Sequence, residues 1–160
     1  MAPRFRHAGF SLVELLVSVA IIGVLASVAM PVVELTQKRQ KEAELRAALR
    51  DIRRAIDAYK DAAKEKRITV AADASGYPLT LTDLVDGVPD LSNKNGAMIY
   101  FLRRIPRDPF NSDPSVSASD TWGKRSYASP ASKPSPGADV YDVYTKSEGI
   151  GLNGIAYKEW

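Results

Sequence analysis

The chain begins with a long apolar run that contains almost no polar side chains. Residues 10–33 read FSLVELLVSVAIIGVLASVAMPVV, in which Glu14 is the one charged residue. As an α-helix this run spans about 36 Å, at about 1.5 Å per residue, which is enough to cross a hydrocarbon core of about 30 Å. The pattern therefore predicts a transmembrane helix.

Residues 34–67 continue the helical pattern in amphipathic form. Apolar side chains recur at spacings of four and three residues, which places them on one face of a helix: Leu45, Leu49, Ile52, Ile56, Tyr59 and Ala63. Charged residues are expected on the other face, where Glu42 with Arg46 and Arg53 with Asp57 form i,i+4 pairs. We predict that this half of the helix lies against a small domain, with its charged face in water or towards other subunits.

Residues 68–160 show turn residues and short alternating runs typical of a small antiparallel sheet. Residues 79–85 predict a short helix that ends at Gly87, and Asp83 suits its first turn. Strands are expected around Tyr127, at 140–144 and at 155–157. The predicted fold class is α+β, with one long N-terminal helix packed on a small antiparallel sheet.

Two segments of this domain are predicted to be loop insertions. Residues 111–120 read NSDPSVSASD, and residues 129–137 are rich in Pro and Ser. Neither segment suggests a function.

The residues before the apolar run predict which way the helix crosses the membrane. Residues 1–9 carry Arg4, Arg6 and His7 and no acid, so the N-terminus is expected in the cytoplasm and the C-terminal domain outside it. A secretory signal peptide cut near residues 26–29 is one alternative, and a plain single-pass anchor is another. Neither alternative gives Glu14 a role.

Glu14 is costly inside a membrane. A carboxylate at the centre of a membrane helix costs about 2.5–3.5 kcal/mol, and less near an end. No Lys or Arg lies within residues 10–33 to pair with it. Glu14 is therefore either tolerated near the interface or paired with a positive group on another chain.

The composition excludes several classes of function. The chain has no cysteine, which removes thiol catalysis, thiolate metal sites and disulfides. Residues 149–154, GIGLNG, match a phosphate-binding glycine loop only in spacing, because no βαβ pattern surrounds them. The net charge is +3, and acids are interleaved with the basic residues of the helix. We expect no enzymatic activity and no nucleic-acid binding.

Residues 6–16, RHAGFSLVELL, resemble the type III signal of type IV pilins and pseudopilins. The resemblance implies that a prepilin peptidase removes residues 1–9 by cutting after Gly9, and that it methylates Phe10 as the new N-terminus. Glu14 then stands where the family places a carboxylate that meets the N-terminal amine of the next subunit. Gly23 and Pro31 stand where the family carries residues that soften the helix.

Residues 100–110, YFLRRIPRDPF, resemble a stretch of the major pseudopilin of type II secretion, with Phe110 in place of the usual Trp. The resemblance implies an inner-membrane protein with a periplasmic head, which polymerises into a helical pseudopilus and drives protein export across the outer membrane. Its implied partners are further copies of itself, minor pseudopilins, the prepilin peptidase and an inner-membrane assembly platform. A pilin of a surface pilus, serving adhesion, motility or DNA uptake, and a tethered binding domain are the alternatives.

Residues 141–149 resemble the pseudopilin loop that helps to hold calcium. Calcium binds six to eight oxygen ligands, and the sequence offers the oxygens of Asp142, Ser147, Glu148 and Asn153, with Asp120 from the inserted loop. Two features depart from the family pattern: the Asp-Gly of the family is replaced at residues 152–154, and Lys146 lies inside the loop. A plain polar loop is the alternative to a calcium site.

Overall fold

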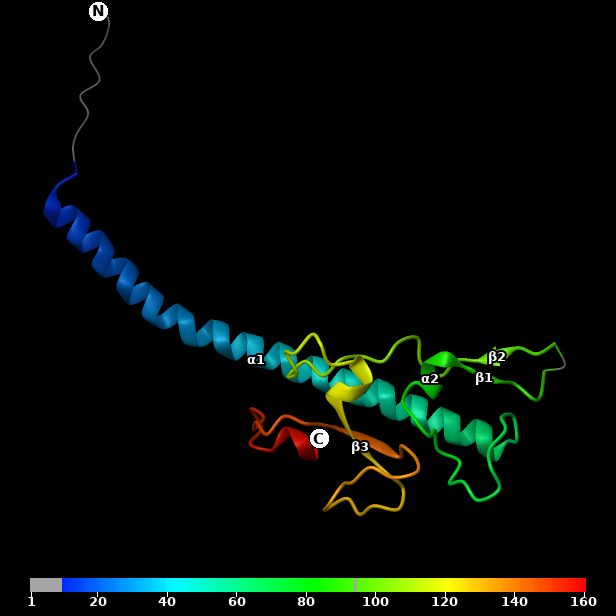
Figure 1. The fold of residues 1–160 in the computed structure, drawn as a ribbon. Coiled ribbons are helices and arrows are strands. Elements are labelled where there is room, and N and C mark those ends of the chain that lie inside the picture. Colours follow the sequence, from blue (N-terminus) through cyan, green and yellow to red (C-terminus); the bar gives the residue numbers. More distant parts are fainter. Residues whose placement is uncertain (1–9, 94) are drawn as a thin grey trace, which may run out of the picture. The chain divides into compact units, whose positions relative to one another are not determined.

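A computed structural model describes residues 10–93 and 95–160, without the side chains of residues 28–31. Its dominant element is helix α1, Leu12–Lys64, which is 53 residues long. The chain divides into two compact units, one up to Gln40 and one from Lys41 onward (Figure 1). Each unit is described by itself below.

The first unit consists of the apolar part of α1. The helix assignment continues through Gly23 and Pro31 without a break in the backbone. By length and composition, α1 is the one helix among the described residues that is suited to crossing a membrane, with a mean hydropathy of 2.5 over its most apolar window. The predicted long apolar helix is therefore present, and its insertion into a membrane stays a prediction.

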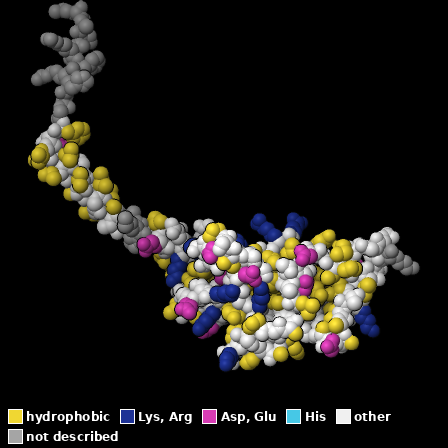
Figure 2. Space-filling view, in the orientation of Figure 1, with side chains coloured by type: hydrophobic (Ala, Val, Ile, Leu, Met, Phe, Trp, Pro, Cys, Tyr) yellow, Lys and Arg dark blue, Asp and Glu magenta, His cyan; other side chains and the backbone are white. Residues whose placement is uncertain are grey.

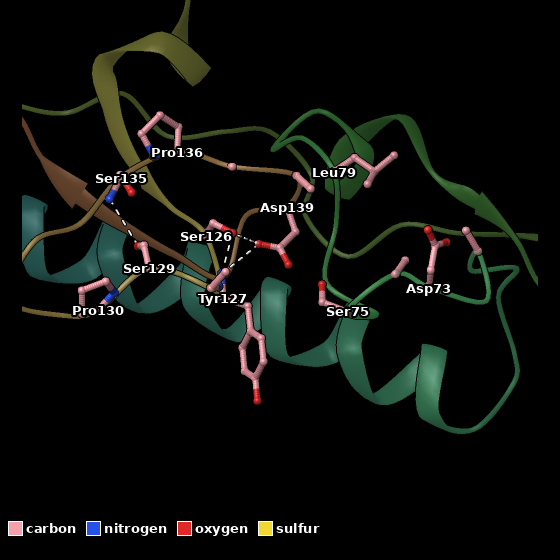
Figure 3. Close-up of a pocket in the computed structure, with 15 residues that line it drawn as sticks. Asp73, Ser75, Leu79, Ser126, Tyr127, Ser129, Pro130, Ser135, Pro136 and Asp139 are labelled. Carbon is pink, nitrogen blue, oxygen red and sulfur yellow. Dashed lines mark hydrogen bonds between the residues drawn. The ribbon is translucent and has the colours of Figure 1, made fainter.

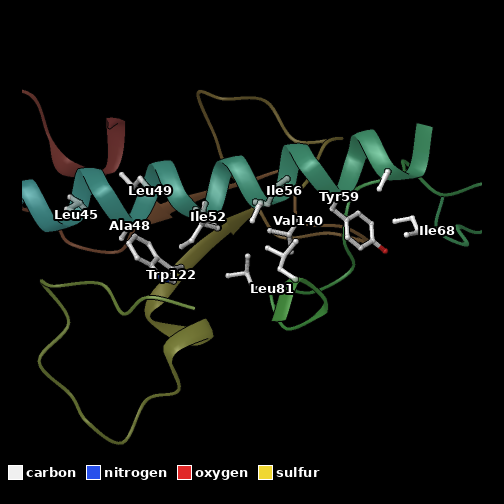
Figure 4. Close-up of a cluster of buried hydrophobic side chains, with 14 of the residues drawn as sticks. Leu45, Ala48, Leu49, Ile52, Ile56, Tyr59, Ile68, Leu81, Trp122 and Val140 are labelled. Carbon is white, nitrogen blue, oxygen red and sulfur yellow. The ribbon is translucent and has the colours of Figure 1, made fainter. Parts of the chain in front are cut away.

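The second unit is a head domain built on the amphipathic part of α1. The predicted apolar stripe faces inward, and Leu45, Ile52 and Ile56 have no exposed surface at all. Side chains from later segments complete the core around this stripe (Figure 4), among them Ile68, Leu81, Leu84, Trp122, Val140, Val143 and Tyr157. This burial against the head stabilises the C-terminal half of α1, because the apolar stripe has no other partner.

Short elements follow α1 in the head. Helix α2, Asp83–Asp86, is shorter than the predicted segment but begins at the expected acid. It ends at Gly87, whose φ of +83° is favourable only for glycine, so the predicted stop is confirmed. After it, β1, Val88–Pro89, pairs antiparallel with β2, Met98–Ile99. The sequence did not predict this small hairpin.

The second sheet lies in the core of the head. Strand β3, Trp122–Arg125, pairs antiparallel with β4, Asp142–Thr145, and Gly123 lies opposite Tyr144. Trp122 is 1% exposed, and its indole N–H donates a hydrogen bond of 2.8 Å to the carbonyl oxygen of Pro106. The head is thus an α+β domain with antiparallel pairing, as predicted, although the strands form two separate sheets.

Two predicted strands were misplaced. Tyr127 lies in a turn after β3, where its ring packs with those of Tyr77 and Tyr141. Residues 155–157 form one isolated bridge, between Ile150 and Ala156, and then a short 3₁₀ helix, η2, Tyr157–Glu159. The apolar side chains at these positions pack locally and do not extend a ladder.

The predicted charged face of the helix also needs correction. Glu42 is only 4% exposed, and its carboxylate accepts hydrogen bonds from the Leu152 N–H at 2.8 Å and the Tyr157 hydroxyl at 3.0 Å. Arg46 stacks over the Trp160 ring at 4.1 Å. Arg53 pairs with Asp142, at 2.7 Å from Nε to Oδ1. All three side chains bind the C-terminal segments of the head, but only Glu42 is buried and requires partners for that reason, since Arg46 is exposed and Arg53 is partly exposed.

Candidate functional site

The apolar half of α1 presents an uncovered hydrophobic surface. The exposed fraction is 78% for Phe10 and 60% for Leu16, and the most apolar window of the helix has no buried residues. Yellow side chains accordingly cover this segment in Figure 2. Large hydrophobics continue along it: Leu12, Val13, Leu15, Val17, Val19, Ile21, Ile22, Val24 and Leu25. A surface of this size requires lipid or other protein chains to cover it.

Glu14 is the one acid in this surface, in the first turn of α1. The Ser18 hydroxyl donates to the main-chain carbonyl of Glu14 at 2.7 Å, and not to its carboxylate. Within residues 10–93 and 95–160, the structure shows no hydrogen bond or ion pair to that carboxylate. A carboxylate near the start of a helix is favoured by the helix dipole, and the pairing of Glu14 with another chain stays a prediction.

The three other predicted positions, Gly9, Gly23 and Pro31, can be placed only in part. Gly9 lies outside the described residues, so the cleavage site stays a prediction. A methyl group added at Gly23 would meet no atom within 4 Å, so this glycine is not required for packing within the chain. The side chain of Pro31 is not described, and helix flexibility at Gly23 and Pro31 remains a prediction.

Four of the five side chains predicted to bind calcium accept hydrogen bonds from other groups of the chain. Asp142 accepts from Arg53 through Oδ1 and from Arg125 through Oδ2, the latter at 3.4 Å. Asn153 Oδ1 accepts from the Ile155 N–H at 3.1 Å. Asp142 is therefore neutralised by two guanidinium groups, which repel a cation.

The remaining predicted ligands form no acidic cluster. Asp120 binds the ammonium of Lys124 at 3.1 Å, while Ser147 Oγ accepts from the Gly149 N–H at 3.3 Å. Glu148 is exposed. Among the described residues, no three Asp, Glu, His or Cys side chains are grouped closely enough to hold a metal. These side chains do not fit a calcium ion as they are arranged.

A groove that the sequence did not indicate lies beside the second predicted insertion (Figure 3). It measures about 630 Å³ and is lined by the segments 71–79 and 126–139. Tyr127, Leu79, Pro130 and Pro136 provide its larger side chains, and the rest are mostly Ser, Ala and Gly. This loop therefore shapes the surface of the head.

Asp139 lines this groove and binds the loop that follows β3. Its Oδ1 accepts hydrogen bonds from the Ser126 hydroxyl and the Tyr127 N–H, both at 2.8 Å. Burial raises the pKa of Asp139, but hydrogen bonds from Ser75, Tyr127 and Ser126 outweigh this effect and hold the pKa below its usual value. The acid is thus a stable carboxylate that organises two loops.

Comparisons with known proteins bear on both units. A family model described as the prokaryotic N-terminal methylation motif matches residues 4–30. The chain is 31% identical to the type II secretion system core protein G of Klebsiella pneumoniae over 112 residues, which is 68% of this chain and 72% of that protein. The chain belongs to the core protein G family. It is also 34% identical to the Escherichia coli (strain K12) core protein G, over 71% of this chain and 73% of that protein.

No solved structure matches the chain. The resemblance to type IV pilin-like proteins, and to the major pseudopilin of type II secretion in particular, is confirmed by the relatives and by the methylation motif.

Two residues of this core protein G family member have structural roles that the sequence analysis missed. Glu42 lies three and seven residues before Leu45 and Leu49, so the helical spacing places it on the apolar stripe. Asp108 is 2% exposed and accepts hydrogen bonds from the Thr145 hydroxyl and from the Phe110 N–H. The helical periodicity could have predicted that Glu42 is buried. Asp108 lies in a loop, where no periodic pattern indicates which side chains are buried.

Proposed function

We propose that this chain is a structural subunit of a type II secretion pseudopilus, assembled through the apolar half of α1. The observation that carries the proposal is the uncovered apolar surface of residues 10–27, interrupted by the single acid Glu14. The methylation motif and the core protein G relatives support the same role. The role is mechanical, and we assign no reaction to the chain.

The same helical surface serves two states of the protein. Before assembly, lipid covers it, and the protein is a single-pass subunit of the inner membrane with a cytoplasmic N-terminus and a periplasmic head. In the filament, α1 helices of neighbouring subunits cover it. The contact joins two different surfaces of identical chains, so it repeats along an axis and does not close into a ring.

Glu14 specifies the register of this contact in our proposal. A prepilin peptidase cuts between Gly9 and Phe10, and the new amine of Phe10 carries one methyl group. The amine of one subunit then pairs with the Glu14 carboxylate of the next, in a setting of low dielectric where an unpaired charge is costly. Minor pseudopilins and an inner-membrane platform are the further partners in assembly.

The mature N-terminus tests this proposal directly. The full chain is expressed with a prepilin peptidase, purified from membranes and analysed by mass spectrometry. A start at Phe10 with one added methyl group is expected. A start near Ala29 or Met30 would show an ordinary signal peptide, and an intact Met1 in the presence of active peptidase would show a tethered domain. Either of these outcomes would overturn the filament model.

A further inference from the structure

The junction between the first inserted loop and the end of β4 is built around buried hydroxyl and carboxyl groups. Thr145, the last residue of β4, has no exposed surface, and its hydroxyl donates to the Asp108 carboxylate. The Asp108 N–H in turn donates to Thr121 Oγ1 at 3.2 Å. These bonds fix the end of β4 beside η1, the 3₁₀ helix Ala118–Thr121.

Lys146 extends from this fixed backbone to the loop. Its ammonium donates a hydrogen bond of 2.7 Å to the carbonyl oxygen of Asp120, which is 26 residues away in sequence. The Ser147 N–H donates to Thr145 Oγ1 at 3.1 Å, which holds the backbone on the other side of Lys146. The lysine therefore links two segments whose positions are already defined.

A second ammonium binds the same residue. Lys124 of β3 pairs with Asp120 Oδ1 at 3.1 Å, and the Ser117 hydroxyl donates to Asp120 Oδ2 at 2.8 Å. Hydrogen bonds from Ser117 and Lys124 hold the pKa of Asp120 below its usual value. Asp120 thus has its carbonyl and both carboxylate oxygens bound by donors of this chain, two of them ammonium groups.

A calcium ion would require the opposite arrangement. It needs six to eight oxygens free of cationic donors, and several of them are usually carboxylates. Here Asp120 is bound by two lysines, and Asp142 by two arginines. A divalent cation at this junction would have to displace the two lysine ammonium groups from Asp120 or lie against their positive charge.

We propose that Lys146 is a built-in cation that joins residues 118–121 to the end of β4, so that this head domain is stable without calcium. The ammonium supplies one positive charge and directed N–H donors at the loop where the family resemblance implies a metal ion. The proposal concerns the head alone and does not depend on filament assembly.

Calcium dependence of unfolding tests the proposal. The thermal midpoint of the full chain in detergent is measured at pH 7, with CaCl₂ and with EDTA. We expect the two midpoints to agree within about 1 °C, since a ligand that does not bind the native state cannot shift its stability. Titration calorimetry with CaCl₂ is expected to show no binding heat. A midpoint raised by calcium, or a measurable binding heat, would overturn the proposal whatever the variants do.

Three variants test the lysine itself. Lys146→Met keeps the length of the side chain and removes the charge, and we expect its midpoint to fall by about 2–4 °C in both CaCl₂ and EDTA. Lys146→Arg keeps a positive donor and is expected to melt close to the unmodified protein. The control is Lys133→Met, at an exposed lysine of the second inserted loop, and we expect it to leave the thermal midpoint unchanged. If Lys146→Met melted at the same temperature as Lys133→Met, Lys146 would not join residues 118–121 to the end of β4.

Discussion

At the scale of single residues, the ion pair between Arg67 and Asp90 illustrates how a charge is fixed at the edge of the head. Arg67 Nη2 lies 2.9 Å from Asp90 Oδ2, and the Arg67 carbonyl accepts from the Leu91 N–H at 2.7 Å. Hydrogen bonds from Arg67, and then from Ser92, lower the pKa of Asp90 to about 2. The segment after α1 is thereby tied to the β1–β2 hairpin.

This pair predicts a specific dependence of stability on pH. The folded-state pKa of Asp90 is below its ordinary value of 3.8, so its contribution is fully present above about pH 4 and is lost as the pH falls through about 2. We expect Asp90→Asn to melt below the unmodified protein at pH 7, with the difference vanishing near pH 2. Melting curves of the full chain in detergent between pH 2 and 7 measure this. A difference that stayed constant over that range would contradict the assignment.

At the scale of elements, the helix was predictable along its whole length, whereas of the strands only the one predicted at 140–144 overlaps an observed strand, β4. The stripe from Leu45 to Tyr59 repeats over several turns, so its period of 3.6 identified both the helix and its buried face. Strands of two to four residues leave too few positions to show a period of two. Tyr127 therefore read as a strand residue, although it packs in a turn.

Of the two candidate sites, the apolar surface of α1 could be predicted from the sequence and the environment of the proposed calcium ligands could not. The assembly surface was predictable, because an apolar run with one acid is a local pattern. The ion pairs of Asp142 were not predictable, because its partners Arg53 and Arg125 lie 89 and 17 residues away in the sequence. Ion pairs between distant segments depend on the finished packing of the head.

Gly123 in β3 gives a test of strand packing. A Cβ at this position would collide with the ring of Tyr144, which lies opposite it in β4. We expect Gly123→Ala to destabilise the head by about 1–3 kcal/mol in denaturant unfolding of the full chain. Adding Tyr144→Val to that variant should recover part of the loss, because the collision is removed.

Gly23→Ala is the matched control for this experiment. It makes the same chemical change where a methyl group meets no atom within 4 Å, in the unit that precedes the head. Unfolding of the head is expected to be unaffected by it. Equal destabilisation by Gly123→Ala with and without Tyr144→Val would show that the tyrosine ring is not the cause.

At the scale of the whole molecule, the two units have different requirements. The head buries its own core, whereas the most apolar window of α1 is uncovered by the described residues of the chain. Stability of the subunit and assembly of the filament should therefore respond to different substitutions. Glu14 separates the two properties, because it lies in the uncovered helix and outside the head.

We expect Glu14→Val to insert into the membrane, to be processed and to fold its head, yet to form no detectable filaments. The apolar side chain suits the membrane but leaves the amine of the neighbouring subunit without a carboxylate. Filaments are scored by electron microscopy and by cross-linking between subunits in cells that carry a type II secretion system. Glu34→Val, at an exposed acid beyond the apolar run, is the control and should assemble. Normal filaments from Glu14→Val would disprove the pairing.

The buried Glu42 carboxylate also has a consequence for the order in which the head folds during synthesis. Its two partners, Leu152 and Tyr157, lie 110 and 115 residues later in the sequence. A ribosome makes the chain from its N-terminus, so Glu42 exists for most of synthesis without either donor. Contacts between residues so far apart form later than local helical contacts, because closing the long loop first costs chain entropy. The nascent head must therefore keep this acid in water until its last segment arrives, and only then can the domain close.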